Sequence, residues 1–203
     1  MKRMLKNSKR FMPTYIIIAL NIIVYVCTSI IGGDFITTGY NAILWLGQVN
    51  ALVLYQGWYW QLFTAMFVHV NIVHLFGNML FLLIFGLRAE ELFSLKEYLL
   101  IYFLSGLAGN LLTLLFGPEM ISAGASGAIF GMFGACAVYV RHAIGQSIIS
   151  ALFYAFFLLM LSSGPSANIF AHLGGLAVGL LIGYLLAATR KRKAMYQYSY
   201  SYQ

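Results

Sequence analysis

The sequence predicts an all-α, polytopic membrane protein built as a bundle of six transmembrane helices. Three observations lead to this fold class. Hydrophobic residues make up 62% of the 203 residues, only 8% are charged, and the mean hydropathy is +0.85. A soluble domain of this size needs far more charge on its surface. The apolar runs are long enough to cross a bilayer, which takes about 20 residues each. They also lack the period-2 alternation of a membrane barrel, which favours helices.

The first predicted span follows a basic N-terminal segment, residues 1–12. An apolar run after a basic start is also typical of a cleaved signal peptide. The run 13–31 is long for a signal peptide, no small-residue cleavage pattern follows it, and further apolar runs come after it. We therefore predict that residues 13–31 form the first transmembrane helix.

Residues 32–60 are apolar but are not predicted to form a transmembrane helix. They are interrupted by Gly39, Gly47 and Gly57 and are rich in Trp and Tyr, which favour the membrane–water boundary. We expect a first outer loop that is embedded in the membrane. The other five helices are predicted at 61–86, 97–116, 123–140, 146–163 and 168–189, so that a six-helix domain spans 13–189. A basic and then Tyr-rich tail, residues 190–203, follows it.

The basic residues predict the topology. Five Lys and Arg precede the first helix, two lie between the second and third, one between the fourth and fifth, and four follow the sixth, so all 12 lie on one side. The positive-inside rule makes that side cytoplasmic, with both termini on it. We therefore interpret the net charge of +7 as a topology signal and predict no nucleic-acid partner. The N-terminus does not resemble an organellar targeting peptide, so we expect an integral multi-pass protein of the plasma membrane.

Three histidines, His69, His74 and His172, lie inside predicted spans, where ionisable groups are costly and often functional. Depth follows from the helical rise of about 1.5 Å per residue, counted from the cytoplasmic helix ends. It places His74 about 20 Å, Ser126 about 21 Å and His172 about 25 Å above those ends. In a hydrocarbon core about 30 Å thick, all three fall at one level in the outer half. Three helices thus bring one hydroxyl and two imidazoles to one level.

The faces of the predicted helices suggest how these residues meet. His74 and Asn78 are i,i+4 and project from one side of the second helix, whereas His69 lies roughly 140° round that helix. Glycines share one stripe with His172 on the sixth helix, and others form a face after Ser126 on the fourth. Close approach of the two glycine faces would bring His172 to Ser126. The two sets are Gly175, Gly179 and Gly183, and Gly127, Gly131 and Gly134.

Such a set suits acyl transfer. A serine hydroxyl is a weak nucleophile until a base within hydrogen-bond reach takes its proton. Neutral His172 could supply that base for Ser126 and return the proton to a leaving amine. Candidate donors to the oxyanion are His74, Asn78 and the backbone N–H at Ser126, and we place Gly124 with this group. The five carboxylates lie in the outer loops or at the cytoplasmic face, so a Ser–His dyad is predicted in place of a triad.

No metal site or cofactor is predicted. His69 and His74 are five residues apart, unlike the i,i+4 histidines of the HExxH zinc motif, and no carboxylate lies at their depth. Cys27 and Cys136 both lie in apolar runs without metal-ligand spacing, which indicates packing roles.

The residue types and their positions alone are also compatible with structural and transport functions. An intramembrane serine usually bonds a carbonyl of its own helix, and a buried histidine or asparagine often holds helices together. Intramembrane polar clusters also serve transporters, in which histidines relay protons.

Three motifs resemble those of rhomboid intramembrane serine proteases of the basic six-helix form. GASGAIFG at 124–131 matches the GxSG nucleophile motif. AHLGGLAVG at 171–179 matches the AHxxG signature of the last helix, and HVNIVHLFGN at 69–78 matches HxxxxHxxxN. The resemblance covers essentially the whole chain.

This resemblance implies that Ser126 is the nucleophile, that His172 is the base, and that His74 and Asn78 stabilise the oxyanion. It also implies a structural or subsidiary role for His69. Two positions depart from the family pattern. Trp60-Gln61 stands where Trp-Arg is common at the end of the first outer loop. Phe130 stands where Tyr is common, and its ring could still pack beside His172. Glu90 matches an acidic position of structural importance.

The resemblance implies a peptidase that cleaves transmembrane segments of other membrane proteins near the outer membrane face. Its partners would be those substrates and the lipid bilayer, and no oligomeric state is predicted. Two rival hypotheses are a non-catalytic rhomboid-like protein that binds membrane clients and a small transporter with a histidine proton relay. Against the transporter, the sequence lacks repeated halves.

Overall fold

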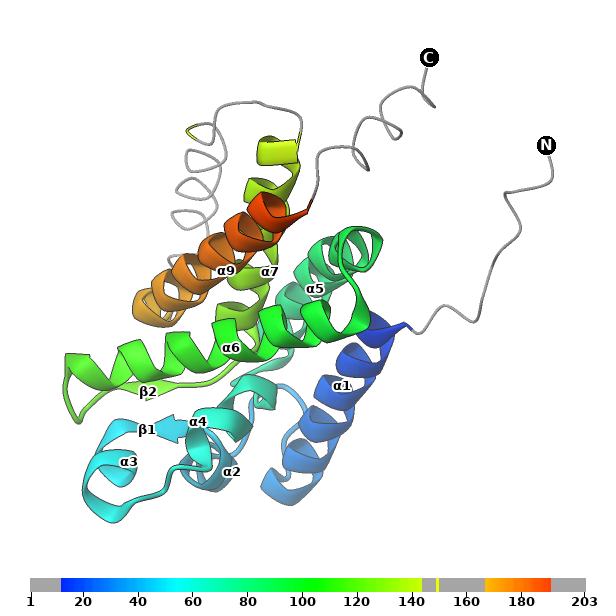
Figure 1. The fold of residues 1–203 in the computed structure, drawn as a ribbon. Coiled ribbons are helices and arrows are strands. Elements are labelled where there is room, and N and C mark those ends of the chain that lie inside the picture. Colours follow the sequence, from blue (N-terminus) through cyan, green and yellow to red (C-terminus); the bar gives the residue numbers. More distant parts are fainter. Residues whose placement is uncertain (1–11, 144–148, 150–166, 191–203) are drawn as a thin grey trace.

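The computed structural model of the protein describes residues 12–143, 149 and 167–190. Within these residues, five long helices form the bundle (Figure 1). They are α1 (Pro13–Gly32), α5 (Ile72–Leu92), α6 (Leu95–Thr113), α7 (Ser126–Ala143) and α9 (Ile169–Thr189). The predicted span 146–163 and the two terminal segments fall almost wholly outside the described residues.

Four helices of the described part are long and apolar enough to cross a membrane: α1, α5, α9, and α6 together with a short 3₁₀ turn, Leu114–Phe116. Large apolar side chains on their outer faces are exposed, including Ile23, Ile31 and Phe76. Exposed apolar side chains along a helix this long indicate contact with lipid. The predicted fold class, an all-α polytopic membrane protein, is confirmed.

The predicted helix 61–86 is wrong at both ends. The chain first forms α4 (Gln61–Thr64) and a 3₁₀ turn (Ala65–Phe67), and then becomes extended at Val68. Helix α5 begins only at Ile72, because the side chain of Asn71 accepts a hydrogen bond from the amide of His74 and so caps the helix. It continues to Leu92. The predicted angle between His69 and His74 therefore does not apply, because His69 precedes the helix.

The first outer loop contains more regular structure than predicted. It includes α2 (Tyr40–Leu46), β1 (Gln48–Val49) and α3 (Asn50–Gln56). Strand β1 pairs antiparallel with β2 (Ile121–Ser122), which lies just before α7. The loop is thus tied directly to the segment that leads into α7.

Gln61 anchors this loop through two hydrogen bonds of its side chain. Its side chain is fully buried, and Oε1 accepts a hydrogen bond from the Val49 amide at 2.9 Å. Its Nε2 donates to the Leu44 carbonyl at 2.7 Å, while the Trp60 indole donates to the Trp45 carbonyl at 3.1 Å. The glutamine at the departing Trp60-Gln61 position therefore supplies both a donor and an acceptor to the loop.

Helices α7 and α9 lie side by side because glycines let their backbones touch. A Cβ atom at Gly175 or Gly179 would lie only 2.0 Å from the carbonyl oxygen of Gly127 or Gly131, respectively. One turn further, a Cβ at Gly183 would lie 2.5 Å from the Ala135 carbonyl. The predicted meeting of the two glycine faces is confirmed, with Ala135 as the third contact. Gly134 also faces α9, where it packs on Leu176.

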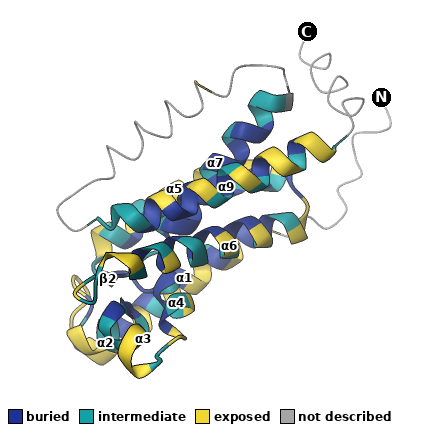
Figure 2. Ribbon diagram, turned by 60° about the vertical axis from the view of Figure 1, so that its left-hand side comes forward, coloured by how far each residue is buried: buried dark blue, intermediate teal, exposed yellow. Residues whose placement is uncertain are grey.

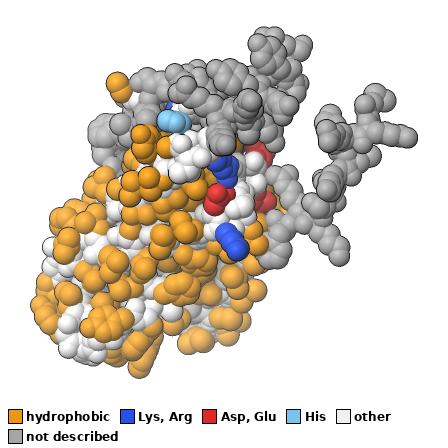
Figure 3. All heavy atoms as spheres, viewed as in Figure 1, with side chains coloured by type: hydrophobic (Ala, Val, Ile, Leu, Met, Phe, Trp, Pro, Cys, Tyr) orange, Lys and Arg blue, Asp and Glu red, His pale blue; other side chains and the backbone are white. Residues whose placement is uncertain are grey.

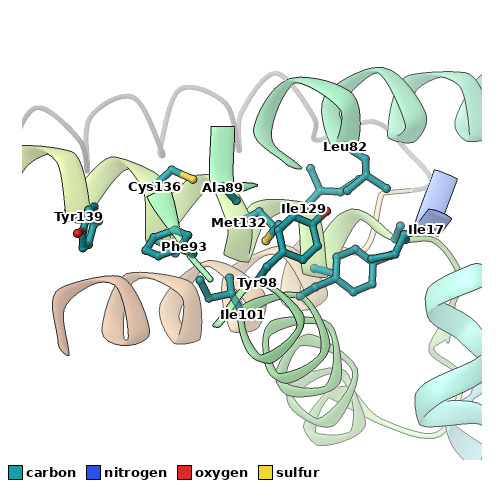
Figure 4. Close-up of a cluster of buried hydrophobic side chains, with 14 of the residues drawn as sticks. Ile17, Leu82, Ala89, Phe93, Tyr98, Ile101, Ile129, Met132, Cys136 and Tyr139 are labelled. Carbon is teal, nitrogen blue, oxygen red and sulfur yellow. The ribbon is translucent and has the colours of Figure 1, made fainter. Parts of the chain in front are cut away.

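Buried apolar side chains fill the space among α1, α5, α6 and α7 (Figure 4). Figure 2 colours the ribbon by burial and shows buried residues along these helices. The centre of this core is formed by Leu82, Tyr98, Ile101 and Met132, which are all fully buried. The core therefore holds the long helices in one fixed arrangement beneath the outer loops.

Charged side chains gather at one end of the bundle, while hydrophobic side chains cover the rest of the same face (Figure 3). At this end the carboxylate of Glu90 accepts a hydrogen bond from the Thr14 amide, at the start of α1. Arg190, at the end of α9, forms an ion pair with Glu97 and donates to the Leu92 carbonyl. The start of α1 and the end of α9 thus both lie close to the end of α5 and the turn to α6.

We predict that Gly179→Ala destabilises the bundle by about 1–3 kcal/mol, because its methyl group would force α9 away from the Gly131 carbonyl. The matched control is Gly77→Ala on α5, where a Cβ would meet no atom of the described residues within 4 Å. Chemical unfolding in detergent measures both. Equal stability of the two variants would contradict the close approach of α7 and α9.

We predict that Gln61→Leu costs about 1–3 kcal/mol for each backbone group that it leaves unpaired, at Val49 and Leu44. Gln56→Leu is the control, because Gln56 is exposed in the same loop. Limited proteolysis of the outer loop gives a second measurement, since a detached loop is cut faster. A Gln61→Leu loop as resistant as wild type would argue against this anchor.

Candidate active site

Ser126 is the first residue of α7, at the point where the chain turns from an extended segment into the helix. The amide of Gly124 donates to the Ala65 carbonyl at 2.9 Å, which fixes the turn before Ser126. The first amides of a helix have no partner within it, and the helix dipole favours negative charge there. Ser126 therefore sits where a developing anion is stabilised.

His172 lies in the first turns of α9 and faces Ser126. Its Nε2 is 2.9 Å from the Ser126 Oγ, which is hydrogen-bond distance, and its side chain is 95% buried, with 5% exposed. The ring of Phe130 stacks on the imidazole with 4.5 Å between centroids and 21° between planes. The hydrogen bond and the stacked ring together restrict how the imidazole turns.

His74 and Asn78 project from one face of α5 into the same pocket as Ser126. Asn78 Nδ2 donates to the His74 carbonyl at 2.9 Å. Among the described residues, Asn78 Oδ1 and His74 Nδ1 are buried without a hydrogen-bond partner. Both side chains thus keep polar atoms for another molecule.

Gly124 makes room for the ring of His74. A Cβ atom at this position would lie 2.8 Å from His74 Cε1 and 3.0 Å from Nε2. The φ angle of Gly124 is +127°, which side chains other than glycine rarely adopt. The GxSG motif therefore needs its first glycine both for the turn and for the position of His74.

His69 lies behind His74 and does not line the pocket. It is fully buried, and its ring meets that of His74 edge-on with 5.2 Å between centroids. Its backbone carbonyl accepts a hydrogen bond from the Thr38 hydroxyl, which joins it to the outer loop. This position fits a supporting role.

The three candidate residues lie at nearly the same distance from the far ends of their helices. His74 precedes the end of α5 at Leu92 by 18 residues, and Ser126 and His172 precede Ala143 and Thr189 by 17 each. At the helical rise these separations give about 26–27 Å for all three. The agreement is closer than the sequence predicted, because α5 and α7 extend further than expected.

The pocket around Ser126 has a volume of about 670 Å³ and combines apolar walls with a few polar groups. Its described walls include no Asp or Glu. Across residues 12–143 and 167–190, no group of three or more His, Cys, Asp or Glu could hold a metal ion.

Two polar residues that line the pocket, Asn71 and Asn168, were absent from the predicted set of site residues. Both cap helices, and an Asn directly before an apolar run is the sequence signal that identifies them.

The sequence is similar to a known family model and to several known proteins. The family model of the Rhomboid domain matches residues 56–189. The chain is 35% identical over 167 residues to RHOMBOID-like protein 2 of Arabidopsis thaliana, covering 71% of this chain and 51% of that protein. It is 31% identical to Rhomboid-like protease 3 of Toxoplasma gondii, covering 79% of this chain and 64% of the relative.

A bacterial relative is matched over more of its own length. The chain is 32% identical to the putative rhomboid protease YdcA of Bacillus subtilis, covering 76% of this chain and 81% of that protein. In contrast, the chain spans about half the length of the Arabidopsis relative.

We predict that Gly124→Ala abolishes the reactivity of Ser126 by displacing the His74 ring. Gly117→Ala is the matched control, because Gly117 also has a positive φ, of +95°, but a Cβ there meets nothing within 4 Å. Backbone strain costs about 1–3 kcal/mol in either variant. Labelling by a fluorophosphonate should therefore be lost only in Gly124→Ala. Similar labelling of both variants would show that contact with His74 is unimportant.

Proposed function

Since this chain belongs to the rhomboid family, we propose that it is an intramembrane serine endopeptidase that cuts transmembrane segments of other membrane proteins. The observation that carries this proposal is the distance of 2.9 Å between Ser126 Oγ and His172 Nε2. The name "protease" borne by relatives from Toxoplasma and Bacillus supports the same reaction. Ser126 and His172 are the proposed catalytic residues.

In the first step, His172 takes the proton of the Ser126 hydroxyl while Oγ attacks the scissile carbonyl. The tetrahedral intermediate collapses to an acyl-enzyme, and His172 passes the proton to the leaving amine. This sequence needs a neutral imidazole before attack. The proton acceptor is Nε2, which lies 2.9 Å from the Ser126 Oγ.

The oxyanion of the intermediate needs preorganised hydrogen-bond donors. We assign this role to the Ser126 backbone amide and to the side chains of His74 and Asn78. The amide is available because Ser126 opens α7, and the two side chains border the same pocket. Gly124 contributes indirectly by admitting the His74 ring, and His69 supports that ring from behind.

In the second step, a water molecule must reach the acyl-enzyme. His172 takes a proton from this water as its oxygen attacks the acyl carbon. The bond to Ser126 Oγ then breaks, and His172 returns the proton to Oγ, which restores the free hydroxyl. The polar atoms of His74 and Asn78 can hydrogen-bond to water in the pocket, at a depth where the surrounding lipid excludes water.

The pocket walls favour an apolar substrate segment. Phe81, Phe85 and Ile129 line it below the polar groups. A peptide bond can reach Ser126 only if its segment is extended there, because helix hydrogen bonds hide the carbonyl. We therefore propose substrates with small and helix-weakening residues near the cut.

We also propose a topology for the enzyme. The rhomboid domain spans 13–189, its cut lies near the outer membrane face, and the segments 1–12 and 190–203 are cytoplasmic. The charged end of the bundle, with Glu90, Glu97 and Arg190, would then face the cytoplasm. The plasma membrane is the proposed location.

We predict that Ser126→Ala lowers cleavage of a model transmembrane substrate to background, a loss on the order of 10⁶-fold for a serine nucleophile. Ser105→Ala is the matched control, because Ser105 is a buried serine on α6 whose hydroxyl has no partner among the described residues. It should cleave normally. Electrophoresis of the substrate in detergent measures both.

His172→Ala should likewise lose cleavage, whereas His142→Ala, at the charged end of α7, should keep it. Cleavage that survives in Ser126→Ala would overturn the proposal. Client binding without cleavage in wild type would favour a non-catalytic member. Proton-coupled uptake that depends on His172 but not on Ser126 would favour a transporter.

A further inference from the structure

Asn168 does more than a usual helix cap. Its Oδ1 accepts hydrogen bonds from the amides of Phe170 and Ala171, each at 3.1 Å, so it fixes where α9 begins. The amide of His172 in turn donates to the Asn168 carbonyl at 3.2 Å. The cap therefore lies one helical turn from His172 and sets the start of the turn that carries it.

The other half of the Asn168 side chain reaches a different helix. Its Nδ2 donates to the hydroxyl of Thr113 on α6, with 2.9 Å between the two atoms. Thr113 is fully buried, and its only hydroxyl proton is given to the Gly109 carbonyl at 2.9 Å. The hydroxyl must therefore accept from Asn168. This fixes the direction of the chain of bonds and the orientation of the Asn168 amide.

Thr113 is itself held firmly by the outer loop. The carbonyl of Thr113 accepts a hydrogen bond from Asn50 Nδ2 at 2.8 Å, and the same nitrogen reaches the Gly117 carbonyl at 2.7 Å. Gln48 Nε2 donates to Asn50 Oδ1 at 2.8 Å and to the Asn110 carbonyl at 3.0 Å. Gln48 and Asn50 are fully buried. The end of α6 is thus a rigid support for Asn168.

Glycines place α9 against this support. A Cβ atom at Gly109 would lie 2.3 Å from the Ala171 carbonyl oxygen, and a Cβ at Gly127 would lie 3.1 Å from it. The carbonyl next to His172 is therefore wedged between α6 and α7. The wedge and the glycine contacts with α7 limit movement of α9 as a whole, and the cap at Asn168 sets where its first turn begins.

We propose that Asn168 and Thr113 are positioning residues, which together form a latch that holds the His172 ring at hydrogen-bond distance from Ser126. The proposal rests on the proposed peptidase function and adds two residues to it. Neither residue takes part in the proton transfer. A small displacement of a catalytic group is enough to slow a reaction, since about 1 Å can cost on the order of a hundredfold.

Two single variants break the latch from opposite sides. Thr113→Val removes the hydroxyl and keeps the shape, while Asn168→Ser keeps a good capping oxygen but loses the amide donor. Thr28→Val is the matched control, because Thr28 is also buried and, within the described part of the chain, its hydroxyl bonds only its own helix, at the Tyr25 carbonyl. We expect both latch variants to lose about tenfold to a hundredfold in kcat. KM should stay close to wild type, and the unfolding midpoint should fall by no more than the loss of one hydrogen bond, so that the variants remain folded in the assay. Thr28→Val should keep the wild-type kcat.

The double variant Thr113→Val/Asn168→Ser gives a further readout. Both substitutions break the same hydrogen bond, between Asn168 Nδ2 and Thr113 Oγ1. The double variant should therefore be no slower than the slower single variant. Wild-type kcat in both single variants would overturn the latch. So would a loss of rate fully explained by a smaller folded fraction, or rate losses that multiply in the double variant.

A measurement that needs no activity separates the latch from the proposed function. In protein labelled with ¹⁵N-histidine, the His172 ring signal, identified by its absence in His172→Gln, should shift in both latch variants and not in Thr28→Val. An unmoved signal would overturn the latch. Failure of wild type to cleave or to label at Ser126 would instead refute the peptidase function, and the ring signal would still decide the latch.

Discussion

The close approach of α7 and α9 is the constraint on which the site depends. Their backbones touch at Gly127 and Gly175 and again at Gly131 and Gly179, where any side chain would force the helices apart. A serine and a histidine have short side chains, so their 2.9 Å contact is possible only if the two helices lie this near. In lipid, such contacts rely on packing of small residues, because there is little hydrophobic drive for helices to associate.

A second feature follows from the direction of the helices. His74 is the third residue of α5, Ser126 the first of α7 and His172 the fourth of α9. All three helices therefore begin at the site, where their dipoles favour negative charge. For acyl transfer this is the charge that develops on the substrate carbonyl. The same ends are capped by side chains, Asn71 on α5 and Asn168 on α9, so the site is surrounded by groups that hold helix starts in place.

The outer loop acts as a scaffold for these helix starts. Gln61 fastens the loop to itself, and Gln48 and Asn50 fasten it to the end of α6. Strand β1 pairs with β2 just before Ser126. Every one of these bonds satisfies a backbone or amide group that would be costly to leave unpaired in the membrane. The same hydrogen bonds therefore stabilise the loop and hold the helix starts around the site in place.

The sequence by itself determined the membrane fold, the long spans and the identities of Ser126, His74, Asn78 and His172 as candidates, because apolar runs, glycine spacing and polar residues within spans are local patterns. It misplaced the start of α5 and the facing of His69, since the cap at Asn71 outweighs the apolar run that precedes it. Only the tertiary structure revealed how Gln61 anchors the loop and how Thr113 meets Asn168, 55 residues further along the chain. Hydrogen bonds between such distant residues leave no periodic trace, because each partner is chosen by the packing that brings the helices together.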